Sequence, residues 1–108
     1  MFARTVTIRL KAGSVAEFNR TLEKDILPIL RSQKGFQNEV TLVNPNGTEV
    51  VGISLWDNRE SAEAYQRTGY TQVQNLLTNV TTSPPQVQTY DVGINTLQKV
   101  AAGRGQAG

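Results

Sequence analysis

One stretch of the sequence decides the fold, residues 44–60, which read NPNGTEVVGISLWDNRE. Its first four residues predict a tight turn, because asparagine and glycine tolerate the positive φ angles that hairpins require. In the next nine residues, to Trp56, successive side chains point to opposite faces of a strand, and both faces are apolar. This pattern predicts a central strand buried on both faces. Asp57 and Glu60 then have the spacing of a capping box. A helix is therefore expected to begin where this strand ends.

The segments before this stretch predict a strand, a helix and a second strand. Residues 2–10 alternate strongly, and residues 36–43 alternate more weakly, with a polar side that is expected near solvent or an interface. Between them, Ser14 is expected to cap a helix whose apolar residues recur at helical spacing. Pro28 removes one intrahelical hydrogen bond, so a kink or restart is expected near Leu27.

The segments after it predict a broken helix and a last strand. The helix that follows Asp57 is expected to break at Gly69, where a new apolar stripe begins. Two prolines then lead into a weakly patterned strand over residues 87–92, which is typical of a sheet edge. The order is therefore β-α-β-β-α-β with an antiparallel sheet, an α+β fold of ferredoxin-like topology. Residues 1–93 form this domain, and residues 94–108 are expected to be a largely flexible extension.

Helices on one side of such a sheet leave its other face bare. We expect the bare face to carry Val50 and Trp56, whose exposure to water would cost about 25 cal/mol per Å². Pairing two sheets face to face removes that cost. The sequence therefore predicts a homodimer that closes into a barrel-like core.

Composition excludes several kinds of partner and of chemistry. The formal charge is +2 over 108 residues, and residues 1–93 carry nine basic and nine acidic side chains, which argues against nucleic acid and anionic membranes as partners. The chain has no cysteine and no histidine, so the commonest nucleophilic, metal-binding and haem-binding side chains are missing. We expect no metal and no cofactor. The sequence has no leader-like or membrane-spanning pattern, which favours a cytoplasmic location.

The strand that ends in Trp56, the acidic helix cap, the alanine-rich turn that runs to Tyr65 and the earlier Gly35-Phe36 together resemble a known family. This is the antibiotic-biosynthesis monooxygenase-like superfamily of dimeric α/β barrels, and the resemblance covers residues 1 to about 93. It implies cofactor-independent oxygenation of aromatic or quinol compounds, with a ligand cavity between the sheet and its helices. One branch of the family degrades haem. That branch's asparagine, tryptophan and histidine fall near Val6, Tyr65 and Asn75, and none of the three matches.

Five residues are candidates for the site. Tyr65 and Tyr70 are the predicted catalytic residues, because positioned tyrosines can hydrogen-bond or deprotonate a phenolic substrate. Trp56, Arg4 and Val6 are the predicted substrate-binding residues, with Trp56 stacking on an aromatic ring and Arg4 stabilising an enolate or carboxylate. Trp56, Arg4 and the two tyrosines have structural alternatives: Trp56 in the core or an interface, Arg4 at the sheet rim, and the tyrosines as buried rings with wet hydroxyls.

Two functions remain open at this point. The first is a cofactor-free monooxygenase in which the substrate's own carbanion or phenolate reduces dioxygen, while the protein deprotonates, orients and excludes water. The second is a non-catalytic dimer that binds a small hydrophobic or aromatic ligand or serves a stress-related role. The absence of histidine, cysteine and paired carboxylates favours the second. A closed cavity with an inward tyrosine hydroxyl would favour the first.

Overall fold

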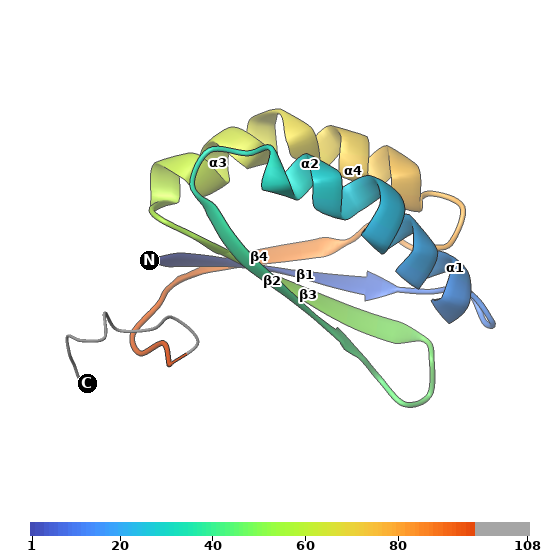
Figure 1. Ribbon diagram of the computed structural model, residues 1–108. Helices are drawn as coiled ribbons and strands as arrows, with labels where there is room; N and C mark the ends of the chain where they lie inside the picture. The colour runs from blue at the N-terminus through green and yellow to red at the C-terminus, as the bar shows by residue number, and fades with distance from the viewer. Residues whose placement is uncertain (97–108) are drawn as a thin grey trace.

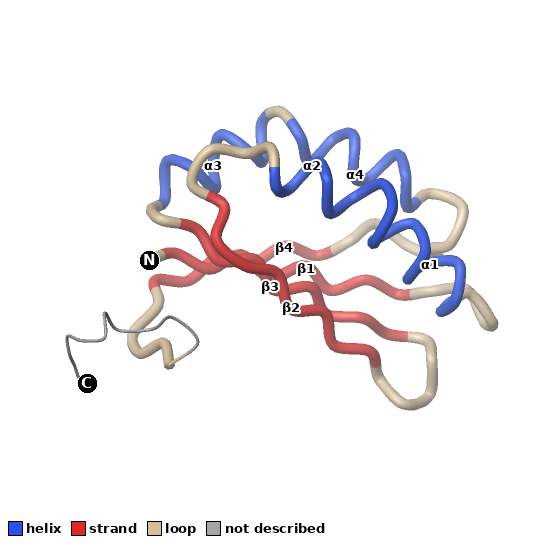
Figure 2. Tube along the Cα trace, viewed as in Figure 1, coloured by secondary structure: helices blue, strands red, loops and turns tan. Residues whose placement is uncertain are grey.

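The computed structural model describes residues 1–96 and has one four-stranded antiparallel sheet, with strand order β2-β3-β1-β4, covered by helices on one face (Figures 1 and 2). This confirms the predicted ferredoxin-like α+β fold. The predicted flexible extension falls mostly on residues 97–108, which lie outside the described residues. In chain order the elements are β1 Phe2–Arg9, α1 Val15–Thr21, α2 Leu27–Arg31, β2 Phe36–Val43, β3 Glu49–Trp56, α3 Arg59–Arg67, α4 Gly69–Leu77 and β4 Gln86–Asp91.

Strand β3 lies at the centre of the sheet, as its apolar sequence predicts, between β1 and β2. Strand β4 is an edge strand, also as predicted. The hairpin between β2 and β3 turns at Gly47, whose φ is +77°. The Asn46 side chain holds this turn, because its Oδ1 accepts hydrogen bonds from the backbone N and the hydroxyl of Thr48, at 2.9 and 2.8 Å.

Two helical arms cover the sheet: α1 with α2 is the first, and α3 with α4 is the second. The first arm breaks where Pro28 predicts. A π-helical turn, Leu22–Ile26, separates α1 from α2, and α2 begins at Leu27 with Pro28 in its first turn, where a missing N–H costs least. The predicted N-cap position at Ser14 is confirmed, since the helix begins at Val15, but the Ser14 side chain makes no capping hydrogen bond. The cause is local backbone geometry: Ser14 has φ −99° and ψ 4°, whereas a capping residue is normally extended.

The second helical arm is capped one residue later than the sequence predicts. Asn58, with an extended backbone, accepts a hydrogen bond from the Ser61 backbone N at 2.9 Å, whereas Asp57 accepts one from the Gln37 side chain. The predicted break is confirmed, because α3 ends at Arg67 and α4 begins at Gly69. A Cβ on Gly69 would lie 3.0 Å from the Tyr65 ring, so glycine there lets that ring pack against the break.

The predicted assignment of the two sheet faces is wrong. Val50 and Trp56 are fully buried beneath the helices, and the opposite set of β3 side chains faces away from them. The alternation of β3 could not decide between the faces, because both sets are apolar. We call the uncovered side the open sheet face. Pairing of β2, β3, β1 and β4 puts these side chains on it: Val40, Leu42, Val51, Ile53, Leu55, Ala3 and Tyr90.

Candidate functional site

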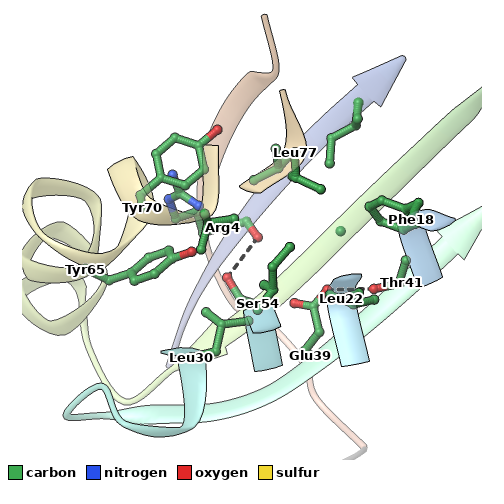
Figure 3. Close-up of a pocket in the computed structure, with 15 residues that line it drawn as sticks. Arg4, Phe18, Leu22, Leu30, Glu39, Thr41, Ser54, Tyr65, Tyr70 and Leu77 are labelled. Atoms are coloured by element: carbon green, nitrogen blue, oxygen red, sulfur yellow. Dashed lines mark hydrogen bonds between the residues drawn. The ribbon is translucent and has the colours of Figure 1, made fainter. Parts of the chain in front are cut away.

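A cavity of about 50 Å³ lies between the sheet and the two helical arms (Figure 3). This volume has room for a few water molecules. Its walls are mostly aliphatic, and the π-helical turn supplies Leu22 and Ile26, whose placement agrees with the tendency of such turns to occur at functional sites. The polar residues that line it are Arg4, Glu39, Thr41, Ser54, Tyr65 and Tyr70.

Arg4 crosses the floor of the site from β1 and is only 2% exposed. Its guanidinium carbon lies 4.0 Å from the centroid of the Tyr70 ring and 5.1 Å from that of the Tyr65 ring, both distances typical of cation–π contact. Its Nη2 donates a hydrogen bond to the side-chain oxygen of Gln66. Burial lowers the pKa of Arg4, but a guanidinium remains charged in proteins. The predicted rim position is therefore not where Arg4 lies.

Tyr65 comes from α3, and its hydroxyl points toward the middle of the cavity (Figure 3). Trp56 supports its ring from behind by stacking, with centroids 5.2 Å apart and ring planes 28° apart. Trp56 is itself fixed by a hydrogen bond of 2.9 Å from Nε1 to Ser54 Oγ. Burial raises the pKa of the Tyr65 phenol, against the opposing influence of Arg4. At neutral pH Tyr65 is therefore a hydrogen-bond donor, not a base.

Tyr70 lies at the start of α4, with its ring over the Arg4 guanidinium (Figure 3). Its hydroxyl oxygen is buried and makes no hydrogen bond with any part of the chain that the structure describes. Burial is also the main cause that raises the pKa of Tyr70, and the nearby Arg4 guanidinium opposes it. A buried hydroxyl without a partner costs about 1–3 kcal/mol, and such groups often mark functional sites.

Glu39 is a cavity residue that the sequence did not identify. It projects from β2 toward the helices, and its Oε2 accepts a hydrogen bond of 2.8 Å from the Thr41 hydroxyl. Burial raises the pKa of Glu39 to about 7, although Thr41 and the more distant Arg4 both act to lower it. A Cβ on Gly52 would lie 3.3 Å from Oε2, so this glycine leaves space for the carboxylate.

Glu39 was missed because the polar side of β2 was expected near solvent or an interface. The signal that could have found it lies on β3. Glu39 and Thr41 pair with Ser54 and Gly52, two small residues that leave space under the helices in an otherwise bulky strand. Such space on a covered sheet face favours a buried polar group or a cavity.

Four of the five predicted site residues line the same cavity: Arg4, Val6, Tyr65 and Tyr70. Trp56 does not line it, because its ring lies behind Tyr65 and is fully buried. Among residues 1–96, no cluster of three acidic, histidine or cysteine side chains could hold a metal ion. Within the same range, no helix is long and apolar enough to cross a bilayer.

Comparisons with known proteins agree on one family. The family model described as antibiotic biosynthesis monooxygenase matches residues 1–73. Among solved structures, SnoaB, a cofactor-independent oxygenase from Streptomyces nogalater, is 14% identical, with a TM-score of 0.72 over 90% of this chain and 97% of that chain. The ActVA-Orf6 monooxygenase of Streptomyces coelicolor, in complex with nanaomycin D, is 16% identical, with a TM-score of 0.72 over 90% and 91%.

The structural matches show a shared fold, since their identities are too low to transfer an activity. No curated protein matches this chain significantly. The family match covers more than half of the 108 residues and includes β1, β2, β3 and the helices that line the cavity up to Val73. This chain therefore belongs to the antibiotic biosynthesis monooxygenase family.

Proposed function

We propose that the protein is a cofactor-independent monooxygenase that acts on a small aromatic or quinol compound. The observation that carries this proposal is the convergence of a buried cation, Arg4, an inward phenol, Tyr65, and a carboxyl group with a pKa near neutrality, Glu39, on one cavity. The structural likeness to SnoaB and ActVA-Orf6, an oxygenase and a monooxygenase, supports the same class of reaction.

The proposed reaction needs no electron donor besides the substrate. A ring methylene that becomes a carbonyl loses four electrons, and one dioxygen molecule takes them up: one oxygen atom enters the carbonyl, and the other leaves as water with the two methylene hydrogens. Glu39 accepts the first proton from the substrate, since a general base works best with a pKa near the working pH. Arg4 stabilises the enolate or phenolate that results, and Tyr65 and Tyr70 donate hydrogen bonds to it.

Substrate entry requires the helical arms to move. A ligand with one or more aromatic rings needs a pocket of about 300 Å³ or more, whereas the inner cavity has about 50 Å³. Both arms are interrupted next to residues that line the cavity, at the π-helical turn before Leu27 and at Thr68 between Tyr65 and Tyr70. We propose that the arms separate at these two breaks when substrate binds. Trp56 keeps Tyr65 in place during that movement.

Oxygen uptake with a hydroxyanthrone tests the proposed function. We expect one dioxygen molecule consumed per ring methylene oxidised, above the uncatalysed rate, and a kcat/KM that rises through pH about 7 as Glu39 ionises. Glu39→Gln should abolish that pH dependence and lower kcat by about 10²-fold or more. Tyr65→Phe should also lower kcat.

Glu60→Gln is the matched control for Glu39→Gln, because Glu60 lies on α3 outside the cavity and is exposed. It should leave oxygen uptake unchanged. If no hydroxyanthrone or quinol is oxidised faster than in the absence of protein, the proposed activity is wrong.

The second candidate is a non-catalytic dimer that binds a small ligand, which the small volume of the inner cavity favours. Saturable binding of a hydroxyanthrone without oxygen uptake would support it.

Both candidate functions include a homodimer that forms through the open sheet face. There Leu42 is 51% exposed, next to Val40, Val51 and Ile53. The other three are half-buried, and an apolar patch on the uncovered face of a sheet is typical of an interface. A monomeric mass at micromolar concentration in sedimentation or light scattering would contradict this proposal. The cytoplasmic location expected from the sequence stays a prediction.

A further inference from the structure

A second cavity, of about 220 Å³, shares Arg4 with the inner one. We call it the outer cavity. The apolar wall of this outer cavity comes from Phe2 and Ala62, both buried. Its polar wall comes from α3 and β4, which supply Arg59, Glu63, Gln66 and Thr89.

Arg4 is a buried cation that makes no close ion pair, although the Glu39 carboxyl group lines the inner cavity with it. Within residues 1–96, the ion pair closer than 4 Å is the one between Arg9 and Glu49, at 3.9 Å on the surface. Arg4 has instead one hydrogen bond to the neutral Gln66 side chain and two aromatic faces. A guanidinium has five N–H donors, and burying its charge without a closely paired anion is unfavourable. This arrangement favours the recruitment of an anion.

Arg59 adds a second positive charge to the same cavity. Its guanidinium carbon lies 5.5 Å from the centroid of the Phe2 ring, which keeps the charged group over the cavity wall. Glu63 contributes one negative charge, so two cations and one anion leave the outer cavity with an excess of positive charge. Apolar surface and two guanidinium groups together suit a ligand that has both a carboxylate and an apolar body.

We propose that the outer cavity binds a small organic carboxylate. Its charged end contacts Arg4 and Arg59, and its apolar part packs on Phe2 and Ala62. The site does not rest on the proposed oxygenation, because its occupancy is measured by binding alone.

Calorimetric titration with benzoate tests the site, with benzamide as the neutral analogue of the same shape. We expect benzoate to bind, its affinity to fall with added salt, and benzamide to bind at least about tenfold more weakly. Arg59→Gln should weaken benzoate about tenfold or more, since a hydrogen bond to a charged group contributes about 1.5–3 kcal/mol. Arg67→Gln is the matched control, an exposed arginine of the same helix outside the cavity, and should bind benzoate as the unaltered protein does.

Gln66→Glu tests the part played by Arg4 without removing it. The new carboxylate would replace the amide oxygen that accepts the Arg4 hydrogen bond and would supply the missing anion from within the chain. We therefore expect this variant to lose benzoate binding and to unfold at a higher temperature. Because Gln66 is exposed, the substitution should not disturb the core.

Four results would overturn the proposal. Equal affinity for benzoate and benzamide would mean that the charge is not recognised. Equal losses in Arg59→Gln and Arg67→Gln would mean that net charge, and not this cavity, attracts the ligand. Inorganic sulfate that binds as tightly as benzoate would mean that the apolar wall contributes nothing. Unchanged benzoate binding by Gln66→Glu would remove Arg4 from the site.

Discussion

Under the helices the sheet carries Arg4, Glu39 and Ser54, whereas its open face carries Val40, Leu42 and Ile53. The covered face is still the more apolar of the two, since Phe2, Ile8, Val50 and Trp56 are also buried on it. Here buried charge lowers stability on one side, and exposed aliphatic surface forfeits hydrophobic stabilisation on the other. Both costs make sense if each face has a task, chemistry or ligand binding beneath the helices and association on the open face.

Trp56 is the residue whose loss should damage the covered face most. Its side chain is fully buried between Phe36 and Tyr65, so Trp56→Ala should lower the free energy of unfolding by about 3–5 kcal/mol. Trp56→Phe, which keeps an aromatic ring in that row, should cost clearly less. Urea denaturation monitored by circular dichroism gives both values. A loss below about 1 kcal/mol for the alanine variant would show that the packed rings of Phe36, Trp56 and Tyr65 are not part of the stable core.

Leu42 provides the corresponding test of the open face. Leu42→Glu should leave monomer stability nearly unchanged but weaken dimerisation by about 2–4 kcal/mol, because a symmetric interface loses the side chain twice. Sedimentation equilibrium measures the dimer dissociation constant from which this free energy follows. Thr82→Glu introduces the same charge at an exposed loop position away from the face and should not change it. Equal weakening by both variants would assign the effect to net charge.

Some features that the sequence predicted correctly have local causes. The turn at Gly47 and the break before Pro28 follow from the backbone preferences of single residues, so no distant contact was needed to predict them. Which face of β3 the helices cover is decided by the rest of the fold. Both of its alternating sets are apolar, and the sequence therefore assigned Val50 and Trp56 to the wrong face.

The difference between local and distant causes also explains which site residues could be predicted from the sequence. Arg4 and Tyr65 were identified because a charge in an apolar strand and an aromatic ring in an amphipathic helix stand out from their neighbours. Glu39 alternates with apolar residues on an edge strand, a pattern that usually means solvent. Only the cavity volume above Gly52 and the hydrogen bond from Thr41 distinguish it. The outer cavity, which brings Arg59 to Arg4, has no counterpart in any local pattern.

Glu39 should make stability fall as the pH rises. Its pKa is about 7 in the folded protein, above its ordinary value of 4.5, so the folded state holds a proton that the unfolded state has lost between these pH values. The stabilisation is fully present below pH about 4.5 and is lost as the pH rises to about 7, by an amount on the order of 3 kcal/mol.

Urea denaturation at pH 5 and pH 8 measures this loss. Glu39→Gln should remove most of it and make the protein more stable than the unaltered chain at pH 8. Glu49→Gln, at a partly exposed carboxylate of the neighbouring strand, serves as the control and should keep the pH dependence. If stability instead stayed constant between pH 5 and pH 8, the Glu39 carboxyl group would be as well solvated in the folded state as in the unfolded state, and its pKa would not be raised.

The smallest expected effect concerns the Tyr70 hydroxyl, and its sign is informative. Because this buried oxygen has no hydrogen-bond partner within residues 1–96, Tyr70→Phe should be neutral or should stabilise the protein by up to about 1 kcal/mol. If Tyr70 served only to pack the core, its unpaired hydroxyl would contribute no stability. If the hydroxyl binds substrate, the same variant should lose affinity for a hydroxyanthrone while it gains stability. A destabilised Tyr70→Phe would show that the hydroxyl already has a partner, such as a bound water, and belongs to the structural core and not to the site.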